Sequence, residues 1–370
     1  MAYEIDFIGV AKDKAKKDAD AISIRWNSLG GKQKVVVYDG GFEAHGIAMA
    51  ENMDSYYFNN VHQKVIDAVI VSHSDMDHTA GLKIILQRFE VKALYMNRPW
   101  EHVDDLFLRV NDGRVTKESL QRRLKENYSF IAELEDIASQ LKIPIYNVFE
   151  GTKIIDDLIV LSPSKEFYID LLTESAKNSC LENVENKNGL GLLGTILAEA
   201  KGKIKGLIES WDVEQLRENE VTSSENETSV VVLGDMMDEK FLLVGDAGIR
   251  ALNHALNYAE NKLRVSVADK VNCLQIPHHG GKHNISPSIL NRMVGGIVRE
   301  GCKRGKEAIV SVAEGSDHPR QIVTNAYIRR GVTVVATHGK TICHRHNMSL
   351  RPGWSPAAVE NFDKHVEDWD

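Results

Sequence analysis

Cysteine is scarce in this chain, and the few cysteines lie far apart. The 370 residues contain 4 of them, with no Cys-x-x-Cys pair: Cys180, Cys273, Cys302 and Cys343. This spacing argues against a zinc knuckle, and so few cysteines in a long chain argue against a disulfide framework. We therefore expect buried free thiols.

Long apolar runs and an excess of basic residues are also absent. No stretch approaches the roughly eighteen apolar residues of a membrane span, and Met1–Val10 lacks the basic and apolar regions of a signal peptide. We therefore expect a cytoplasmic protein with no membrane partner. The net charge of −8 argues against a passive nucleic-acid coat. An enzyme acting on a phosphodiester is still allowed, because metal ions or a local basic patch can supply positive charge.

What the chain does contain is a series of short apolar runs, each stopped by turn residues. Their length and their β-branched and aromatic content predict buried strands. Helical spacing between some of the later runs predicts helices, and this mixture indicates a layered α/β architecture. The predicted strands are 35–38, 68–71, 93–96, 229–233, 241–244, 272–276, 308–312 and 332–336, and the predicted helices include 288–298 and 321–330.

The middle of the chain has a different pattern. Apolar residues recur at helical spacing over 130–141 and 193–207, and the only clear strand nearby is 158–161. We interpret 101–225 as a largely helical insertion within a domain that spans 1–350. This insertion could pack against a second copy, which leaves a homo-oligomer open. The acidic tail 351–370 is interpreted as either a docked helix or a loose end.

A dense group of metal-binding side chains follows the predicted strand 68–71. Within six residues the chain has His73, Asp75, Asp77 and His78, in the order His-x-Asp-x-Asp-His. Imidazoles and carboxylates are ligands of Zn²⁺ and Mn²⁺. Four of them are more than one open site needs, and they suit two ions about 3.5–4 Å apart. The alternative is a polar loop in which Asp75 or Asp77 caps a helix that starts near Thr79.

Two later strands end in residues of the same kind. The predicted strand 241–244 runs into Asp246, which lies among glycines and is well placed to bridge two ions. The predicted strand 272–276 runs into the adjacent pair His278 and His279, again beside glycines. A Gly-Asp turn that only ends a strand, and a surface histidine pair without a role, are the alternatives.

With these residues in place, the chain resembles the metallo-β-lactamase superfamily, which has His-x-His-x-Asp-His after a strand. The variant with Asp75 at the second histidine is similar to the soluble domain of ComEC-type competence proteins. The likeness covers most of the chain outside the insertion. It includes Asp39-Gly40-Gly41, Leu161-Ser162-Pro163 and Asp317-His318-Pro319. It implies a four-layer αβ/βα sandwich with two metals at one edge.

The resemblance also implies ligands. One ion would take His73 and Asp75, the other Asp77, His78 and one of the His278–His279 pair, with Asp246 bridging. We favour His278 as the ligand, which leaves His279 for substrate contact. Many superfamily members have another histidine between the first motif and the bridging aspartate. Here the only histidine in that interval is His102, which we do not expect to fill that role, so the first ion would be loosely held or completed by water and substrate. The oxygen-rich set favours Mn²⁺, with Zn²⁺ as the alternative.

The implied chemistry is hydrolysis by a metal-bridged hydroxide. Asp77, His279 and His318 are the catalytic candidates, the two histidines to bind a non-bridging oxygen or protonate the leaving group. His318 has an alternative as a turn residue before Pro319.

By analogy with ComEC-type domains we expect a nuclease acting on DNA, in genome defence or DNA processing, and we leave a protein partner open. The alternatives are hydrolysis of a small cyclic nucleotide or other phosphoester, with the insertion as a lid, and a non-catalytic interaction module. The basic clusters that could hold a phosphate backbone, or could be solvated faces, are 12–17, 122–123, 201–205 and 303–306.

Overall fold

A computed structural model describes residues 1–59, 61–110, 114–155, 157–181 and 207–369 of the chain. Its frame consists of two seven-stranded sheets that face each other. No helix in the described ranges combines the length and hydropathy that a membrane crossing requires.

The first sheet comes mainly from the N-terminal part of the chain. Strands β17, β1, β2 and β3 are antiparallel neighbours, and β3, β5, β7 and β8 continue the sheet in parallel. The order is β17-β1-β2-β3-β5-β7-β8. The bounds are β1 Tyr3–Phe7, β2 Ala21–Asn27, β3 Gln33–Gly40, β5 Ala68–Ile70, β7 Leu94–Tyr95, β8 Ile145–Tyr146 and β17 Ile342–His346.

The second sheet comes mainly from the C-terminal part. Strands β13 to β16 are parallel, and β12, β10 and β9 extend the sheet with antiparallel pairs. The order is β16-β15-β14-β13-β12-β10-β9. The bounds are β9 Lys153–Ile155, β10 Leu158–Ser162, β12 Val231–Met236, β13 Glu239–Leu243, β14 Val271–Gln275, β15 Lys306–Val310 and β16 Val332–Ala336.

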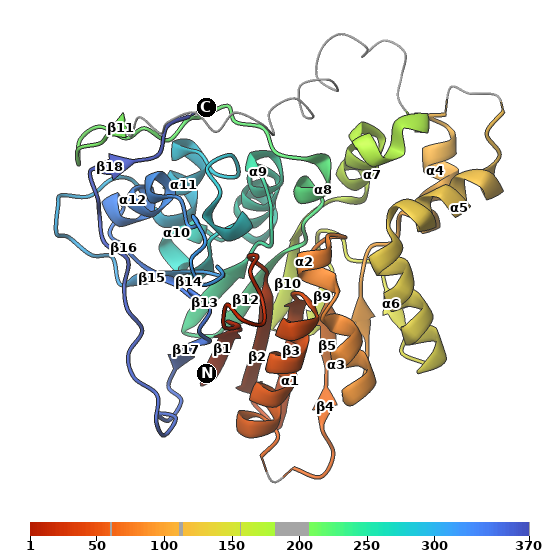
Figure 1. The fold of residues 1–370 in the computed structure, drawn as a ribbon, viewed down its shortest axis with the longest axis horizontal. Helices are drawn as coiled ribbons and strands as arrows, with labels where there is room; N and C mark the ends of the chain where they lie inside the picture. The colour runs from red at the N-terminus through yellow and green to blue at the C-terminus, as the bar shows by residue number, and fades with distance from the viewer. Residues whose placement is uncertain (60, 111–113, 156, 182–206, 370) are drawn as a thin grey trace.

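Helices cover the outer face of each sheet, which gives four layers (Figure 1). Two smaller strand pairs, β4 (Val65–Ile66) with β6 (Glu90–Val91) and β11 (Leu207–Ile208) with β18 (His365–Val366), lie outside the sheets. The remaining elements are α1 Glu43–Tyr56, α2 Met76–Thr79, α3 Leu82–Arg88, η1 Pro99–His102, α4 Val103–Phe107, α5 Lys117–Asn127, α6 Ser129–Gln140, α7 Lys165–Glu174, η2 Ala176–Leu181, α8 Ser224–Glu227, α9 Ile249–Tyr258, η4 Ala259–Leu263, α10 Val267–Lys270, η5 His278–Gly280, α11 Pro287–Val294 and α12 Gln321–Arg329.

Strand periodicity explains why three cores form. In β3, Val35 and Val37 face the helices α1 and α3, while Val36 and Tyr38 face the second sheet. A strand places alternate side chains on opposite faces, so a continuous apolar run fits a strand that is buried on both faces. The predicted mixed α/β sandwich is confirmed by this layering.

The segment 101–225 contains more strand than its spacing predicts. The helix expected at 130–141 is present as α6, and the strand expected at 158–161 is present as β10. Three short strands were missed: β8 and β9, which join the first and the second sheet respectively, and β11, which pairs with β18. The helix expected at 193–207 falls largely outside the described residues, and the boundaries of the insertion stay a prediction.

The C-terminal tail is neither a helix nor a loose end. Its strand β18 pairs with β11, Val366 is buried, and the indole nitrogen of Trp369 donates to the carbonyl oxygen of Gln215 at 2.9 Å. The expected burial of free thiols holds for Cys273 and is wrong for Cys302, which is exposed in a turn between Gly301 and Gly305.

Three glycines allow the loop after β5 to pack closely against its neighbours. A Cβ atom on Gly81 would lie 2.0 Å from the carbonyl oxygen of Gly40, and one on Gly46 would lie 2.3 Å from that of Gly81. Backbone therefore packs against backbone where β3, α1 and the α2–α3 turn meet. This contact fixes the position of the His73–His78 segment relative to the first sheet.

We expect Gly81→Ala to lower the free energy of unfolding by about 1–3 kcal/mol, because the added methyl group overpacks a rigid contact. Chemical denaturation would measure the change. Gly30→Ala is the matched control, since the nearest atom to a Cβ there is 4.0 Å away. Equal stability of the two variants would contradict this account of the contact.

Candidate metal centre

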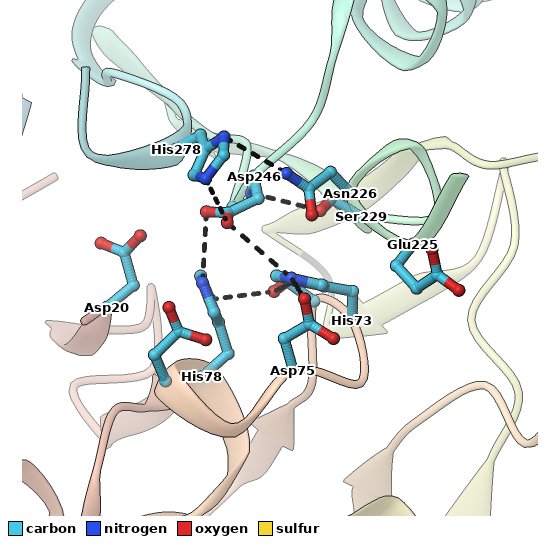
Figure 2. A network of polar contacts seen from close by, with 12 residues as sticks. Asp20, His73, Asp75, His78, Glu225, Asn226, Ser229, Asp246 and His278 are labelled. Atoms are coloured by element: carbon cyan, nitrogen blue, oxygen red, sulfur yellow. Dashed lines mark hydrogen bonds and ion pairs between the residues drawn. The ribbon is translucent and has the colours of Figure 1, made fainter. Parts of the chain in front are cut away.

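Segments from both sheets bring ligand-type side chains together at one edge of the sandwich. The loop after β5 carries His73 to His78, the turn after β13 carries Asp246, and the turn after β14 carries His278 and His279. Parallel strands present their carboxyl ends at the same edge, which explains the convergence of Asp246 with the histidine pair. Figure 2 shows His78 and His278 on opposite sides of Asp246.

Asp246 lies at the centre of the group, and its side chain is only 4% exposed. Its Oδ1 atom lies 3.2 Å from His78 Nε2. Its Oδ2 atom lies 3.7 Å from His278 Nε2 and 3.9 Å from His73 Nε2. One oxygen atom of the carboxylate thus faces His78, and the other faces His73 and His278.

The other carboxylates of the motif divide between the same two sets. Asp75 Oδ2 lies 3.7 Å from His73 Nε2, and Asp77 Oδ2 lies 3.6 Å from His279 Nε2. We call His73, Asp75 and His278 the first set, and Asp77, His78 and His279 the second set, with Asp246 shared.

Each imidazole of the two sets is oriented through its other ring nitrogen. His78 Nδ1 lies 2.9 Å from Asp39 Oδ2, and His279 Nδ1 lies 2.9 Å from the carbonyl oxygen of Ser311. The Nδ1 atoms of the first set contact other polar groups, His73 with Ser72 Oγ at 3.0 Å and His278 with Asn284 Oδ1 at 2.8 Å. Such outer contacts hold the ring orientation of metal-ligating histidines in proteins. All four Nε2 atoms are consequently turned toward Asp246 or Asp77.

The backbone explains how two adjacent histidines reach the same group. His278 and His279 both have positive φ angles, 47° and 54°, in the left-handed region that side chains other than glycine rarely adopt. In an extended strand the two rings would point to opposite faces. Strain of this kind persists where the surrounding structure enforces it, often at functional sites.

Several buried polar atoms in the group lack a hydrogen bond of regular geometry. They are Nε2 of His73, His78 and His279, and Oδ1 of Asp246. Buried polar atoms are nearly always paired, so such atoms point to a missing partner. Because they face one another at ligand-like distances, the residues present fit bound cations.

The electrostatics of the second set show strong coupling between imidazoles and carboxylates. Burial would lower the pKa of His78, but Asp246 and Asp39 raise it well above its usual value. Burial would likewise lower the pKa of His279, and Asp77 raises it to about 9. Positive charge on these rings balances the carboxylates, and a bound cation would compete with those protons for the same nitrogen atoms.

Asp20 is part of this group, and the sequence reasoning missed it. Its carboxylate lies within 4.8 Å of ligand atoms of His78, Asp246 and His279, and burial raises its pKa to about 6. The backbone nitrogen of Asp20 donates to the carbonyl oxygen of Asp77, which ties the first hairpin to the motif. The available signal was a charged residue between the apolar residues Ala19 and Ala21.

Three further points from the sequence concern Asp75 as a helix cap, His318 and His102. Asp75 lies at the N-cap position of α2, but its side chain accepts no capping hydrogen bond, and the residue before α3 is Gly81. The interpretation of Asp75 as a helix cap is therefore wrong. His318 Nδ1 donates to the Asp18 carboxylate at 2.8 Å, and His318 lines a hollow that also includes His278. His102 packs against Phe149 and Tyr168 on the insertion.

Two open hollows flank the group. One, of about 600 Å³, is lined by Asp77, His279, Lys16 and Lys17, so the first basic cluster does reach the mouth of the site. The other lies on the side of His278 and has a volume of about 510 Å³.

The other basic clusters are placed differently. Arg122 and Arg123 are exposed on α5, and 201–205 falls outside the described residues. Lys306 is buried with its amine donating to the carbonyl oxygen of Val271, so its cluster is partly structural.

Comparison with family models matches residues 26–138 to the metallo-beta-lactamase superfamily. The matched segment includes β3, α1 and the His73–His78 motif. The match and the four-layer arrangement together support the metallo-β-lactamase fold. Comparison with curated proteins finds no match.

Several solved structures are similar to the chain. A diphosphatase from the PhnP family has 11% identity and a TM-score of 0.39, with 93% of this chain and 98% of that chain covered. The Zn(2+)-bound PqqB from Methylobacterium extorquens has 11% identity and a TM-score of 0.38, with 92% and 99% covered. The metallo-beta-lactamase fold protein YhfI from Bacillus subtilis has 10% identity and a TM-score of 0.37, with 92% and 99% covered.

Proposed function

We propose that this protein is a two-metal hydrolase that cleaves phosphodiester bonds, with DNA as its substrate. The observation that carries the proposal is the division of ligands by Asp246, whose Oδ1 atom faces His78 at 3.2 Å while its Oδ2 atom faces His73 and His278 at 3.7–3.9 Å. A metal-binding interaction module would not need two sets that share one carboxylate. Two ions on a shared carboxylate are the arrangement of two-metal phosphoesterases.

In this proposal the first set holds one ion and the second set holds the other. His278 then binds the first ion together with His73, in the ligand position that His102 does not fill. His279 binds the second ion. Asp20 would add a further carboxylate beside His279. Each set joins two imidazole nitrogens to carboxylate oxygens, a composition that Zn²⁺ and Mn²⁺ both accept.

Lysine and histidine side chains around the candidate centre would orient the substrate and supply positive charge. When bound, the ions supply a water that loses its proton near neutral pH and stabilise negative charge on the phosphate oxygens. Lys16 and Lys17 line the hollow beside Asp77, and Lys177 Nζ lies 3.0 Å from Asp75 Oδ1. These amines place positive charge where a phosphate backbone would approach. His318 is positioned by Asp18 on the other side, where it could protonate a leaving group.

The shape of the surroundings favours an extended substrate over a small one. Hollows lie on both sides of the ligand group, and neither is a closed chamber around it. A polymer can occupy both sides at once, whereas a small cyclic nucleotide would leave one side unused. This supports the nuclease proposal over the small-phosphoester alternative.

We expect end-labelled single- or double-stranded DNA to be cleaved when Mn²⁺, Mg²⁺ or Zn²⁺ is added, and cleavage to be lost in Asp77→Ala. Gel electrophoresis of the products against time is the measurement, with a cyclic dinucleotide as the small competitor substrate. A protein that binds two ions but cleaves only the cyclic dinucleotide would overturn the DNA assignment. Absence of any hydrolysis would instead indicate dependence on a protein partner or an interaction module.

A further inference from the structure

A second group of metal-ligand side chains lies away from the candidate centre. It consists of Cys273, Glu307 and His344, whose ligand atoms all lie within 4.8 Å of one another. We call it the distal cluster. We propose that the distal cluster binds a single Zn²⁺ ion, or a similar borderline divalent ion, which links the two sheets of the sandwich.

Strand pairing brings the first two residues together. Cys273 in β14 and Glu307 in β15 are direct partners in the register of the parallel pair. Partners in register have side chains on the same face of the sheet. Cys273 is the middle residue of β14 and Glu307 is the second residue of β15, whereas the candidate centre follows the carboxyl ends of these strands. The distal cluster is therefore set back from the edge that carries the candidate centre.

The third residue comes from the opposite sheet. His344 lies in β17, which pairs with β1 so that His344 is opposite Ile5. Its Nδ1 atom lies 2.6 Å from Glu307 Oε2, and a ring nitrogen lies within 4.8 Å of the sulfur atom of Cys273. One imidazole thus spans the gap between the sheets. Figure 1 shows β17 beside the N-terminus and close to the second sheet.

Further acidic and imidazole groups surround the distal cluster. Tyr3 OH lies 3.2 Å from His344 Nε2 and 3.1 Å from Glu239 Oε2, and Glu239 in turn contacts His346 Nδ1 at 3.1 Å. Among the described residues, the ion pairs of Glu239 and Glu307 involve histidine and neither lysine nor arginine. Two carboxylates and a thiol therefore share a region whose charge depends on protons or on a bound cation.

The ligand types of the distal cluster favour Zn²⁺. Thiolate, imidazole and carboxylate are the three ligand types that Zn²⁺ uses in proteins, at about 2.0–2.3 Å. Around a tetrahedral ion of that size, ligand atoms are separated by roughly 3–4 Å. The contact of 2.6 Å between His344 and Glu307 would therefore have to open slightly, while the Cys273 sulfur already lies within 4.8 Å of both. The fourth position would be filled by water or by Glu239. Binding displaces the proton of the Cys273 thiol to solvent, because a coordinating thiol is deprotonated.

A nucleophilic triad of cysteine, histidine and glutamate is the other chemistry that this group suggests. The Cys273 residue is only 1% exposed, at the centre of the core between the sheets. A buried thiol cannot reach a substrate, so the triad interpretation fails on access. A closed metal site has no such requirement, and it would hold β17 against β14 and β15.

Cobalt substitution tests the proposal in the Asp246→Asn background, where the candidate centre is impaired. After removal of metal with a chelator, we expect Co²⁺ to bind with a thiolate-to-cobalt charge-transfer band and about one equivalent of retained metal. Cys273→Ser and His344→Gln should each lose the band and that equivalent. Cys302→Ser is the matched control and should keep both, because Cys302 is exposed and is not a member of the distal cluster.

Thermal unfolding gives a second readout, because an ion that binds only the folded state stabilises it. Zn²⁺ should raise the melting temperature of the Asp246→Asn protein. It should leave the melting temperature of the double variant, which combines Asp246→Asn with His344→Gln, unchanged. His344 lies at a partly exposed edge, so this variant decides the matter if Cys273→Ser fails to fold. A missing band in the parent, or a band that survives His344→Gln, would overturn the proposal.

Discussion

Asp246→Asn should lower the metal-dependent hydrolysis of DNA by about 10³-fold or more, with loss of both ions of the candidate metal centre. The shared carboxylate contacts both sets, so its replacement weakens two sites at once. Metal ions contribute several kcal/mol to charge stabilisation in the transition state, and each 1.4 kcal/mol corresponds to about a tenfold change in rate. The effect should therefore exceed that of any replacement confined to one set.

The measurement combines kcat/KM on labelled DNA with metal content by mass spectrometry after gel filtration. Asp235→Asn is the matched control, because Asp235 is exposed on β12 and pairs with Lys240 at the surface. It should retain activity and both ions. Retention of two ions and of activity in Asp246→Asn would show that the carboxylate does not bridge, and the two-metal proposal would fall.

The sequence was informative wherever local pattern and tertiary environment agree. The motif from His73 to His78 follows a β-branched strand and collects four ligand-type residues, a density that a surface loop does not need. Asp246 is preceded by a strand in the same way. The structure brings these residues together at the edge where the strands end, as the layered α/β interpretation requires.

The sequence was less informative about the partition of ligands between the two sets. By resemblance we expect His278 to be the ligand and His279 to contact substrate, which leaves the orientation of the two rings open. Two consecutive positive φ angles turn both rings toward the group, and no local signal announces them because both residues are histidines rather than glycines. Tertiary contacts, including those from His279 to Ser311 and from His278 to Asn284, fix this turn.

Short strands were the other source of error. The strands β8 and β9 have two and three residues, too few for a periodic pattern to stand out. They are strands because a neighbour offers hydrogen bonds, β7 for β8 and β10 for β9. Asp20 was missed for a related reason, since its burial depends on Asp77 and His279, which are distant in the sequence.

Replacement of each histidine of the pair separately tests the partition directly. We expect His278→Gln and His279→Gln each to lose about one of the two ions of the candidate metal centre and to lower kcat/KM by roughly 10²–10³-fold, which corresponds to several kcal/mol. The reason is that His278 Nε2 faces Asp246 Oδ2 in the first set, while His279 Nε2 faces Asp77 Oδ2 in the second. Metal content and DNA cleavage would be measured on the same preparations.

The two variants also separate this partition from the sequence prediction that His279 contacts only substrate. If that prediction holds, His279→Gln keeps both ions and loses activity through KM or through the protonation step. If His279 is a ligand, metal content falls together with activity, and added Mn²⁺ or Zn²⁺ restores part of both. His283→Gln is the control, because His283 is exposed on the same loop and pairs with Glu220. Its unchanged metal content would show that the losses follow from the two ligand positions and not from disturbance of the loop after β14.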